Sequence, residues 1–201
     1  MKEAWIESMA KKSIFSSVKI VVITLLVVKL IGFLKQAVIA AYFGTSGEID
    51  KFLLVSEFME NLGAAIFSAI SVTFLTMYID TLVAKGKAES HKFISNVLLT
   101  LAPVVFVLMI VFLLFANQIS LVIAPGYKGN DSLLIAKYIR LFSITMLNMF
   151  IYYVSNAVLE AEKVFFPGKI VGVIRSVSVI SAIVFFAHKL GISAILIGVI
   201  T

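Results

Sequence analysis

The sequence predicts an all-α fold, a polytopic transmembrane helix bundle with about six spans. Of the 201 residues, 61% are hydrophobic and 14% are charged, whereas soluble domains average about 45 to 50% apolar and about 25% charged residues. The mean hydropathy is +1.10. Each span uses about 20 mostly apolar residues, so a chain of this length holds no sizeable soluble domain in addition. We therefore expect an integral membrane protein and not an enzyme.

Two long apolar runs, 18–43 and 49–79, begin the bundle. The turn between them, Gly44 to Gly47, is short, so the two helices are expected to be antiparallel neighbours. The first run contains Lys29 and is too long for a cleavable signal peptide, which predicts a retained first helix. Residues 1–16 carry lysines among apolar side chains, a pattern typical of an amphipathic segment at the membrane interface.

The third helix is predicted over 93–116, where the centre of the run carries no charge. The polar stretch 80–91 precedes it and is expected to form a loop. The apolar segment 119–124 follows it and is expected at the membrane interface, and Pro125-Gly126 predicts a turn.

The fourth and fifth helices are predicted over 132–159 and 170–187. A polar segment, 160–169, joins them and contains the turn signal Pro167-Gly168. A last apolar run begins near residue 191 and reaches only about ten residues, fewer than a span needs. We therefore expect residues 1–201 to be the N-terminal transmembrane part of a longer transporter.

Lysines are distributed unequally between the predicted helix ends. With a cytoplasmic N-terminus, Lys51, Lys128 and Lys189 would lie outside. The larger group would then lie inside: Lys2, Lys11, Lys12, Lys85, Lys87, Lys92, Lys163 and Lys169. Because Lys and Arg are enriched in cytoplasmic loops, this asymmetry predicts a cytoplasmic N-terminus.

Several classes of chemistry find no support in the residues. The chain contains no cysteine, so it has no disulfide, thiol nucleophile or Cys-based metal site. No nucleotide-binding loop, zinc signature or nucleophile elbow occurs. The formal net charge is +6, but the basic residues are scattered singly through apolar segments, which favours anionic membrane lipids over nucleic acid as partners. We expect no catalytic residues, no metal and no cofactor.

Ionisable side chains are predicted at membrane depth: Lys29, Lys35, Glu57 and Glu60. A charge there costs about 2.5 to 3.5 kcal/mol on insertion scales, so such groups usually face a partner or a water-filled pathway. Lys29 lies about 17 Å into its helix, too deep to reach the surface easily. This depth favours substrate binding over an ion pair for Lys29. For Lys35, snorkelling and cavity lining both stay open.

The neighbouring polar positions extend this candidate site. Glu57 and Asn61 share one face of the second helix, which favours a polar cavity. Ala40 lies on the same face of the first helix as Lys29. Arg175 lies within the predicted fifth helix, where a pathway role and a structural ion pair are equally compatible with the sequence.

The run from Lys29 to Leu62, KLIGFLKQAVIAAYFGTSGEIDKFLLVSEFMENL, resembles the opening of the MviN/MurJ-type lipid II flippases. Further similar segments are IAPGY at 123–127 and SNAVLEAEKVFFPG at 155–168. This family belongs to the multidrug, oligosaccharidyl-lipid and polysaccharide exporter superfamily. The resemblance covers essentially the whole chain and implies one lobe of a two-lobe transporter.

The resemblance also implies roles for individual residues. The basic residues of the family's first helix fall at Lys29 and Lys35, and a carboxylate at the start of its second helix falls at Asp50. Cavity-lining positions of the family fall at Ala40 and Asn61.

This chain departs from the family pattern at several positions. Lysines replace the arginines of the first helix, and Gln36 replaces an acidic residue beside the second of them. A pair of arginines expected in the second helix falls at Ala64 and Ala65. Because Arg binds phosphate bidentately and Lys acts as a point charge, recognition of a diphosphate is expected to be weaker or differently built.

Together these observations predict a lipid-linked oligosaccharide flippase of the bacterial cytoplasmic membrane, moving lipid II by alternating access. Lys29 and Lys35 would attract the diphosphate headgroup, Asn61 would donate a hydrogen bond and Glu57 would balance charge. The expected partners are the lipid-linked oligosaccharide, membrane lipids and a coupling cation.

Three alternatives stay open. The first is a flippase for another polyprenyl-linked polysaccharide unit. The second is a cation-coupled multidrug exporter, in which Glu57 or Asp50 binds Na⁺ or H⁺. The third is a non-transporting membrane scaffold, in which Lys29 only pairs with Glu57.

Overall fold

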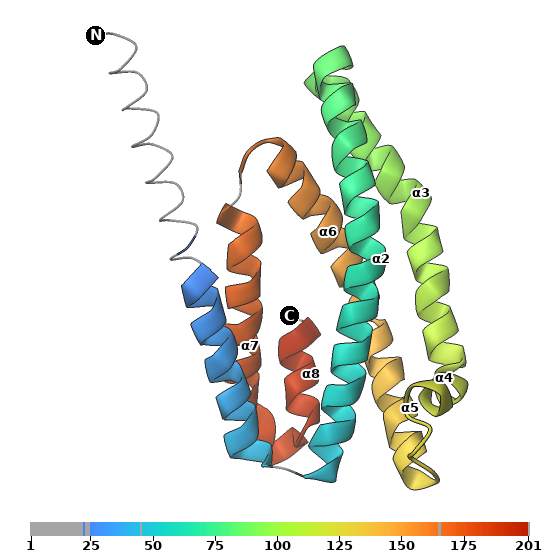
Figure 1. The fold of residues 1–201 in the computed structure, drawn as a ribbon, viewed down its shortest axis with the longest axis vertical. Coiled ribbons are helices and arrows are strands. Elements are labelled where there is room, and N and C mark those ends of the chain that lie inside the picture. The colour runs from blue at the N-terminus through green and yellow to red at the C-terminus, as the bar shows by residue number, and fades with distance from the viewer. Residues whose placement is uncertain (1–21, 23–24, 45, 165, 201) are drawn as a thin grey trace.

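The computed structural model describes residues 22, 25–44, 46–164 and 166–200, and within them the chain forms helices and no strands (Figure 1). The predicted all-α membrane bundle is confirmed. Helices long and apolar enough to cross a membrane are Leu25–Phe43, Gly47–Lys85, Lys87–Leu114, Asn130–Ala161 and Ile170–Leu190. The predicted interfacial segment 1–16 and the start of the predicted first helix at 18 lie outside the described residues.

Helix α2, Gly47–Lys85, is longer than the predicted 49–79. Ser46 caps its start by accepting a hydrogen bond from the backbone N of Ile49 at 3.5 Å. The expected loop at 80–91 is reduced to Gly86, because α3, Lys87–Leu114, begins directly after it. Polar side chains do not by themselves end a helix, whereas the φ of 81° at Gly86 is a conformation that favours glycine.

The predicted fourth helix, 132–159, is divided into α5, Asn130–Ser143, and α6, Thr145–Ala161. At the break, the hydroxyls of Ser143 and Thr145 donate hydrogen bonds at 2.7 Å to backbone carbonyls three residues earlier. Such side-chain bonds to the backbone compete with the regular helical pattern and often bend helices.

The remaining helices also differ from the predicted boundaries. The apolar segment at 119–124 forms most of a short helix, α4, Ala116–Ile123. Helix α7, Phe166–Leu190, begins earlier than residue 170 and includes Pro167, which the first turn of a helix tolerates because its missing N–H has no intrahelical partner there. The last apolar run forms α8, Ser193–Ile200.

The helices pack in two groups. The first, here the α2–α6 group, contains α2, α3, α4, α5 and α6. In it α2 packs along α5 and α6, and aromatic pairs such as Phe52–Tyr138 and Phe67–Phe150 join them. The buried side chains of α2 recur at helical spacing and form one stripe: Ile49, Phe52, Val55, Met59, Phe67, Phe74 and Tyr78.

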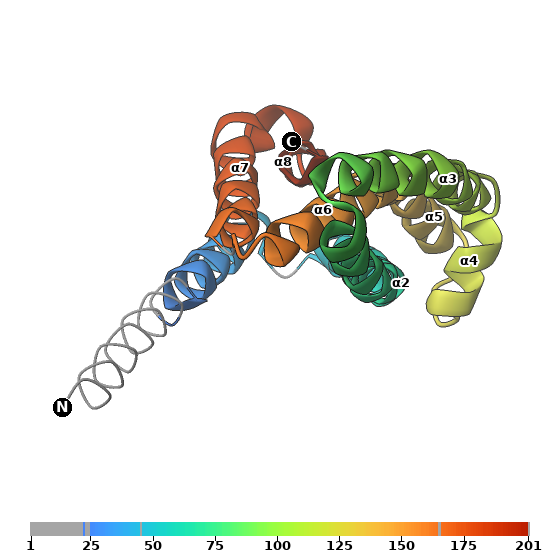
Figure 2. The same cartoon turned by 90° about the horizontal axis from the view of Figure 1, so that it is seen from above.

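The second group, here the α7 group, contains α7, α8 and the Leu25–Phe43 helix. Helices α7 and α8 pack closely on each other. The Leu25–Phe43 helix approaches α7 where Val28 faces Gly172. Figure 2 shows the α7 group on one side of the molecule and α2, α3 and α5 on the other, with α6 between them.

Candidate functional site

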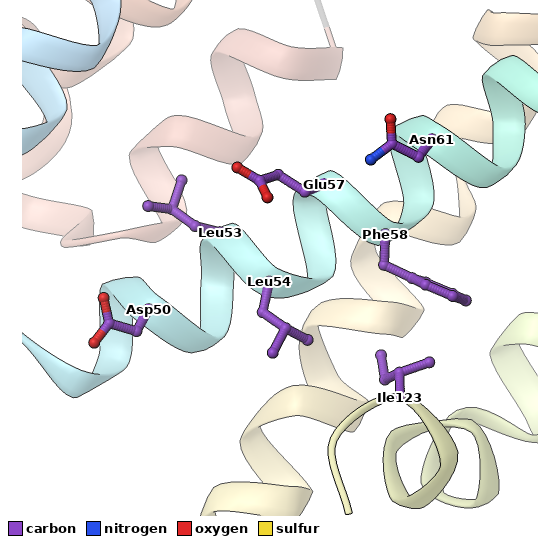
Figure 3. A pocket seen from close by; sticks show the side chains of 7 residues that line it. All are labelled: Asp50, Leu53, Leu54, Glu57, Phe58, Asn61 and Ile123. Atoms are coloured by element: carbon purple, nitrogen blue, oxygen red, sulfur yellow. The ribbon is translucent and has the colours of Figure 1, made fainter.

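One face of α2 carries the polar residues that line a hollow of about 550 Å³. Asp50 and Glu57 are about two helical turns apart, and Asn61 follows Glu57 by about one turn, so the three residues share one face of α2. All three side chains are exposed. Figure 3 shows these three side chains leaving α2 on the same side, while Leu54 and Phe58 extend toward Ile123 of α4. The hollow is acidic, since its lining contains carboxylates and no cation.

A cluster of opposite charge lies beside this face. Arg175 of α7 donates a hydrogen bond from Nη2 to Oε1 of Glu60 on α2 at 2.6 Å, which also makes an ion pair. The hydroxyl of Ser56 lies 3.5 Å from the same carboxylate oxygen. The two charged side chains are 37% and 40% exposed, so the pair is only partly covered by the rest of the bundle.

Lys35 joins this cluster from a third helix. It is half-buried in the Leu25–Phe43 helix, where the charge of Glu60 attracts it and that of Arg175 repels it, although it forms no ion pair with Glu60 among the described residues. Segments far apart in the sequence therefore bring two cations and one carboxylate together, a set here called the charge cluster: Lys35, Glu60 and Arg175. Its excess positive charge in an apolar bundle is suited to binding an anion.

Other predicted site residues lie elsewhere. Lys29 is exposed on the Leu25–Phe43 helix, and across the described part of the chain it forms no ion pair with Glu57. Ala40 is also exposed, and its carbonyl accepts a hydrogen bond from the N–H of Gly44 at 2.9 Å, at the end of that helix. Lys35 and Arg175 are thus brought together, whereas Lys29 and Ala40 stay apart from the charge cluster.

Glu60 was not among the predicted binding residues. Its position in an apolar run was the available signal, because a carboxylate at membrane depth requires a partner. That partner, Arg175, is 115 residues away in the sequence. Spacing along one helix could not reveal a contact of this kind.

A second polar cluster joins the start of α2 to α5 and to Tyr127 in the segment before α5. Lys51 forms an ion pair with Asp131 at 2.7 Å and lies over the ring of Tyr127, 5.6 Å from its centroid. The hydroxyl of Tyr138 on α5 donates a hydrogen bond to Glu48 at 2.8 Å. Sequence reasoning assigned Lys51 only to a set of outer charges and missed this contact.

Among the residues that the structure describes, no group of three or more His, Cys, Asp or Glu side chains is placed to hold a metal ion. Asp50 and Glu57 are separated by about 10 Å along the helix axis, at 1.5 Å per residue. The two carboxylates would therefore act separately on a cation.

Comparison with known proteins matches residues 39–201 to the family model described as Lipid II flippase MurJ. The chain belongs to this family. The match contains Arg175 and the whole polar face of α2, whereas Lys29 and Lys35 precede it.

Curated members of the family are similar over most of this chain. It is 26% identical over 184 residues to the probable lipid II flippase MurJ of Aquifex aeolicus, covering 89% of this chain and 36% of that protein. It is 24% identical over 171 residues to the lipid II flippase MurJ of Thermosipho africanus, covering 85% and 35%. The chain thus spans about a third of the length of these relatives.

A solved structure supports the same fold. The chain superposes on the lipid II flippase MurJ in an inward closed conformation with a TM-score of 0.74 and 24% identity. The superposition covers 89% of this chain and 38% of that one.

Proposed function

We propose that this chain forms the headgroup-binding lobe of a lipid-linked oligosaccharide flippase in the bacterial cytoplasmic membrane. Lipid II, a polyprenyl diphosphate carrying a peptidoglycan unit, is the proposed substrate, and alternating access between two lobes is the proposed mode of transport. Membership of the lipid II flippase MurJ family supports this substrate. The observation that carries the proposal is the convergence of Lys35 and Arg175 beside the polar face of α2.

The charge cluster suits a diphosphate for physical reasons. A guanidinium can bind two phosphate oxygens at once, and an ammonium adds a point charge with no fixed direction. In our proposal Arg175 and Lys35 hold the diphosphate, and the exposed Lys29 attracts it. Asn61 donates hydrogen bonds to the headgroup.

Other residues shape the remaining space. Asp50 and Glu57 line the hollow beside the headgroup, and Ala40 leaves room for it. The polyprenyl tail stays in the hydrocarbon region, because removing it from lipid would bring no hydrophobic gain.

The test is complementation of a flippase-depleted bacterial strain by the full-length protein. Arg175→Met and Lys35→Met should each lose growth support, whereas Arg175→Lys and Lys35→Arg should retain part of it because they keep the charge. Lys92→Met, which removes a cation paired with Glu89 within α3, is the matched control. Membrane levels of every variant are compared by blotting.

The scaffold alternative makes a different prediction. If Arg175 only pairs with Glu60, the double change Arg175→Met with Glu60→Leu should restore a stable apolar contact and keep function, as replaced buried pairs often do. A well-inserted double variant that still supports growth would show that Arg175 does not bind the headgroup.

A second candidate, a cation-coupled exporter, is favoured by the acidic lining of the hollow itself. In that case Asp50 or Glu57 binds Na⁺ or H⁺ and the transported solute is a cationic drug. Proteoliposomes distinguish the two candidates. A flippase moves a fluorescent lipid-linked headgroup, whereas the exporter moves a cationic dye and loses this activity in Asp50→Asn or Glu57→Gln.

A further inference from the structure

The arginine proposed to bind the substrate already holds an anion in this structure. The carboxylate of Glu60 lies 2.6 Å from Arg175 and also attracts the charge of Lys35, with which it forms no ion pair in the described part of the chain. A phosphate that approached the same two cations would meet a group of the same charge in the same place. Binding therefore requires either a second free face on Arg175 or the departure of Glu60.

We propose that Glu60 is a displaceable counter-ion, which occupies the anion position of the charge cluster until the diphosphate of the lipid substrate replaces it. This inference rests on the proposed function and adds a specificity-determining residue to it. Glu60 offsets part of the positive charge of Arg175 and Lys35 in the empty site, and a weakly charged lipid headgroup cannot compete with it. A diphosphate can displace Glu60, because it carries more charge and more acceptor oxygens than a carboxylate.

The surroundings of the Glu60–Arg175 pair favour replacement of Glu60 by a ligand over a permanent ion pair. Both side chains are more than a third exposed, so an incoming ligand can reach them without opening the core. The backbones of α2 and α7 scarcely approach each other, so few other contacts between these helices hold the pair together. After displacement, the hydroxyl of Ser56, one turn earlier on α2, remains within reach of the Glu60 carboxylate.

Exchange also has a structural consequence. The Glu60–Arg175 contact is one of the links between the α2–α6 group and the α7 group; another is the hydrogen bond from the Tyr152 hydroxyl on α6 to the Gly168 carbonyl on α7 at 3.3 Å. When a diphosphate takes Arg175, this link is released, and α7 can shift relative to α2. Binding of the headgroup is thereby connected to a movement between two parts of the same lobe.

The experiment measures binding of geranylgeranyl diphosphate to the purified full-length protein in detergent by calorimetry, with geranylgeraniol as the ligand lacking phosphate. Glu60→Gln removes the competing charge and keeps the side-chain size. It should bind the diphosphate about tenfold more tightly, since a charge-assisted hydrogen bond typically contributes at least about one tenfold step. Glu89→Gln, which breaks an ion pair within α3, is the matched control and should not change binding.

A double-mutant cycle tests whether the effect of Glu60 on diphosphate binding depends on Arg175. Arg175→Gln alone should weaken diphosphate binding at least about tenfold, and adding Glu60→Gln to it should then change binding less than about twofold, because the competition for Arg175 is gone. If Glu60→Gln is poorly inserted, Glu60→Asp serves instead. Its shorter side chain retains the charge but reaches Arg175 less well, so binding should tighten by about threefold.

The outcomes separate this inference from the proposed function. If Arg175→Gln weakens binding but Glu60→Gln fails to tighten it, Glu60 is a structural partner and the counter-ion role is wrong while the headgroup site stands. If neither Arg175→Gln nor Lys35→Met alters diphosphate binding, or the unaltered protein does not bind it, the proposed function itself is wrong.

Discussion

At the scale of single residues, two glycines show how closely the helices approach. A Cβ at Gly198 of α8 would collide with the backbone of α7, where it would meet Val179 Cα, Val179 N at 2.8 Å and Ser178 O at 2.9 Å. A Cβ at Gly63 of α2 would collide with the end of the Met149 side chain, at 2.6 Å from Sδ, and would make ordinary contact with Phe67 Cδ2 at 3.8 Å. A flexible thioether can move aside, whereas backbone atoms move only with their helix.

We therefore expect Gly198→Ala to destabilise the protein by about 1 to 3 kcal/mol, the typical range for overpacking. Gly63→Ala, the matched control, should change stability by less than about 1 kcal/mol because Met149 can adopt another rotamer. Thermal unfolding in detergent, followed by intrinsic fluorescence, measures both. Equal stability of the two variants would contradict the close packing of α8 on α7.

At the scale of elements, the start of α2 is fastened to the segment that leads into α5. The side chain of Lys51 is only 11% exposed and joins Asp131 and the Tyr127 ring. The segment between α4 and α5 contains Pro125 and Gly126 and has no regular structure of its own. Its order therefore depends on the contact of Lys51 with the Tyr127 ring and on the ion pair that holds Asp131, just after the segment, at the start of α5.

Removal of that contact should loosen the segment locally. We expect Lys51→Met to increase tryptic cleavage after Lys128 about fivefold, since loss of a pair worth about 1 kcal/mol changes a local opening equilibrium by about that factor. Lys85→Met, at the far end of α2, should leave this cleavage rate unchanged. The rates are read from the fragment pattern on gels. Equal cleavage in all three proteins would show that the ion pair does not order the segment.

At the scale of the whole molecule, α2 is longer than a membrane is thick. Its 39 residues extend about 58 Å at 1.5 Å per residue, against a hydrocarbon core of about 30 Å. The junction at Gly86 and the segment between α4 and α5 lie at opposite ends of the bundle (Figure 1). The lysines near Gly86 thus belong to a helical hairpin that we expect to project into the cytoplasm, as the charge asymmetry predicts.

This orientation can be tested with single cysteines, because the chain has none of its own. A membrane-impermeant thiol reagent applied to intact cells should label Lys128→Cys and spare Lys87→Cys. Both should be labelled after lysis, which controls for reactivity. Labelling of position 87 alone in intact cells would show that the orientation is opposite to the predicted one.

Much of the architecture follows from the sequence alone, because it depends on local properties. Apolar composition and run length predict membrane helices, and within the described residues the structure has candidate spans at the first five predicted runs, while the sixth forms the short helix α8. Helix ends were less predictable. Residues 80–91 appeared to be a loop because they are polar, but a polar stretch outside the membrane can remain helical until a residue such as Gly86 adopts a positive φ.

The candidate site likewise has a part that the sequence predicts and a part that it does not. Asp50, Glu57 and Asn61 lie on one helix, so helical periodicity alone places them on one face, and the structure shows them lining one hollow. Depth along the first helix favoured Lys29 over Lys35, yet Lys35 is the lysine beside Arg175. Which side chains meet across helices depends on how α2, α7 and the Leu25–Phe43 helix pack. That packing is a property of distant segments, so only the tertiary structure pairs Arg175 with Glu60.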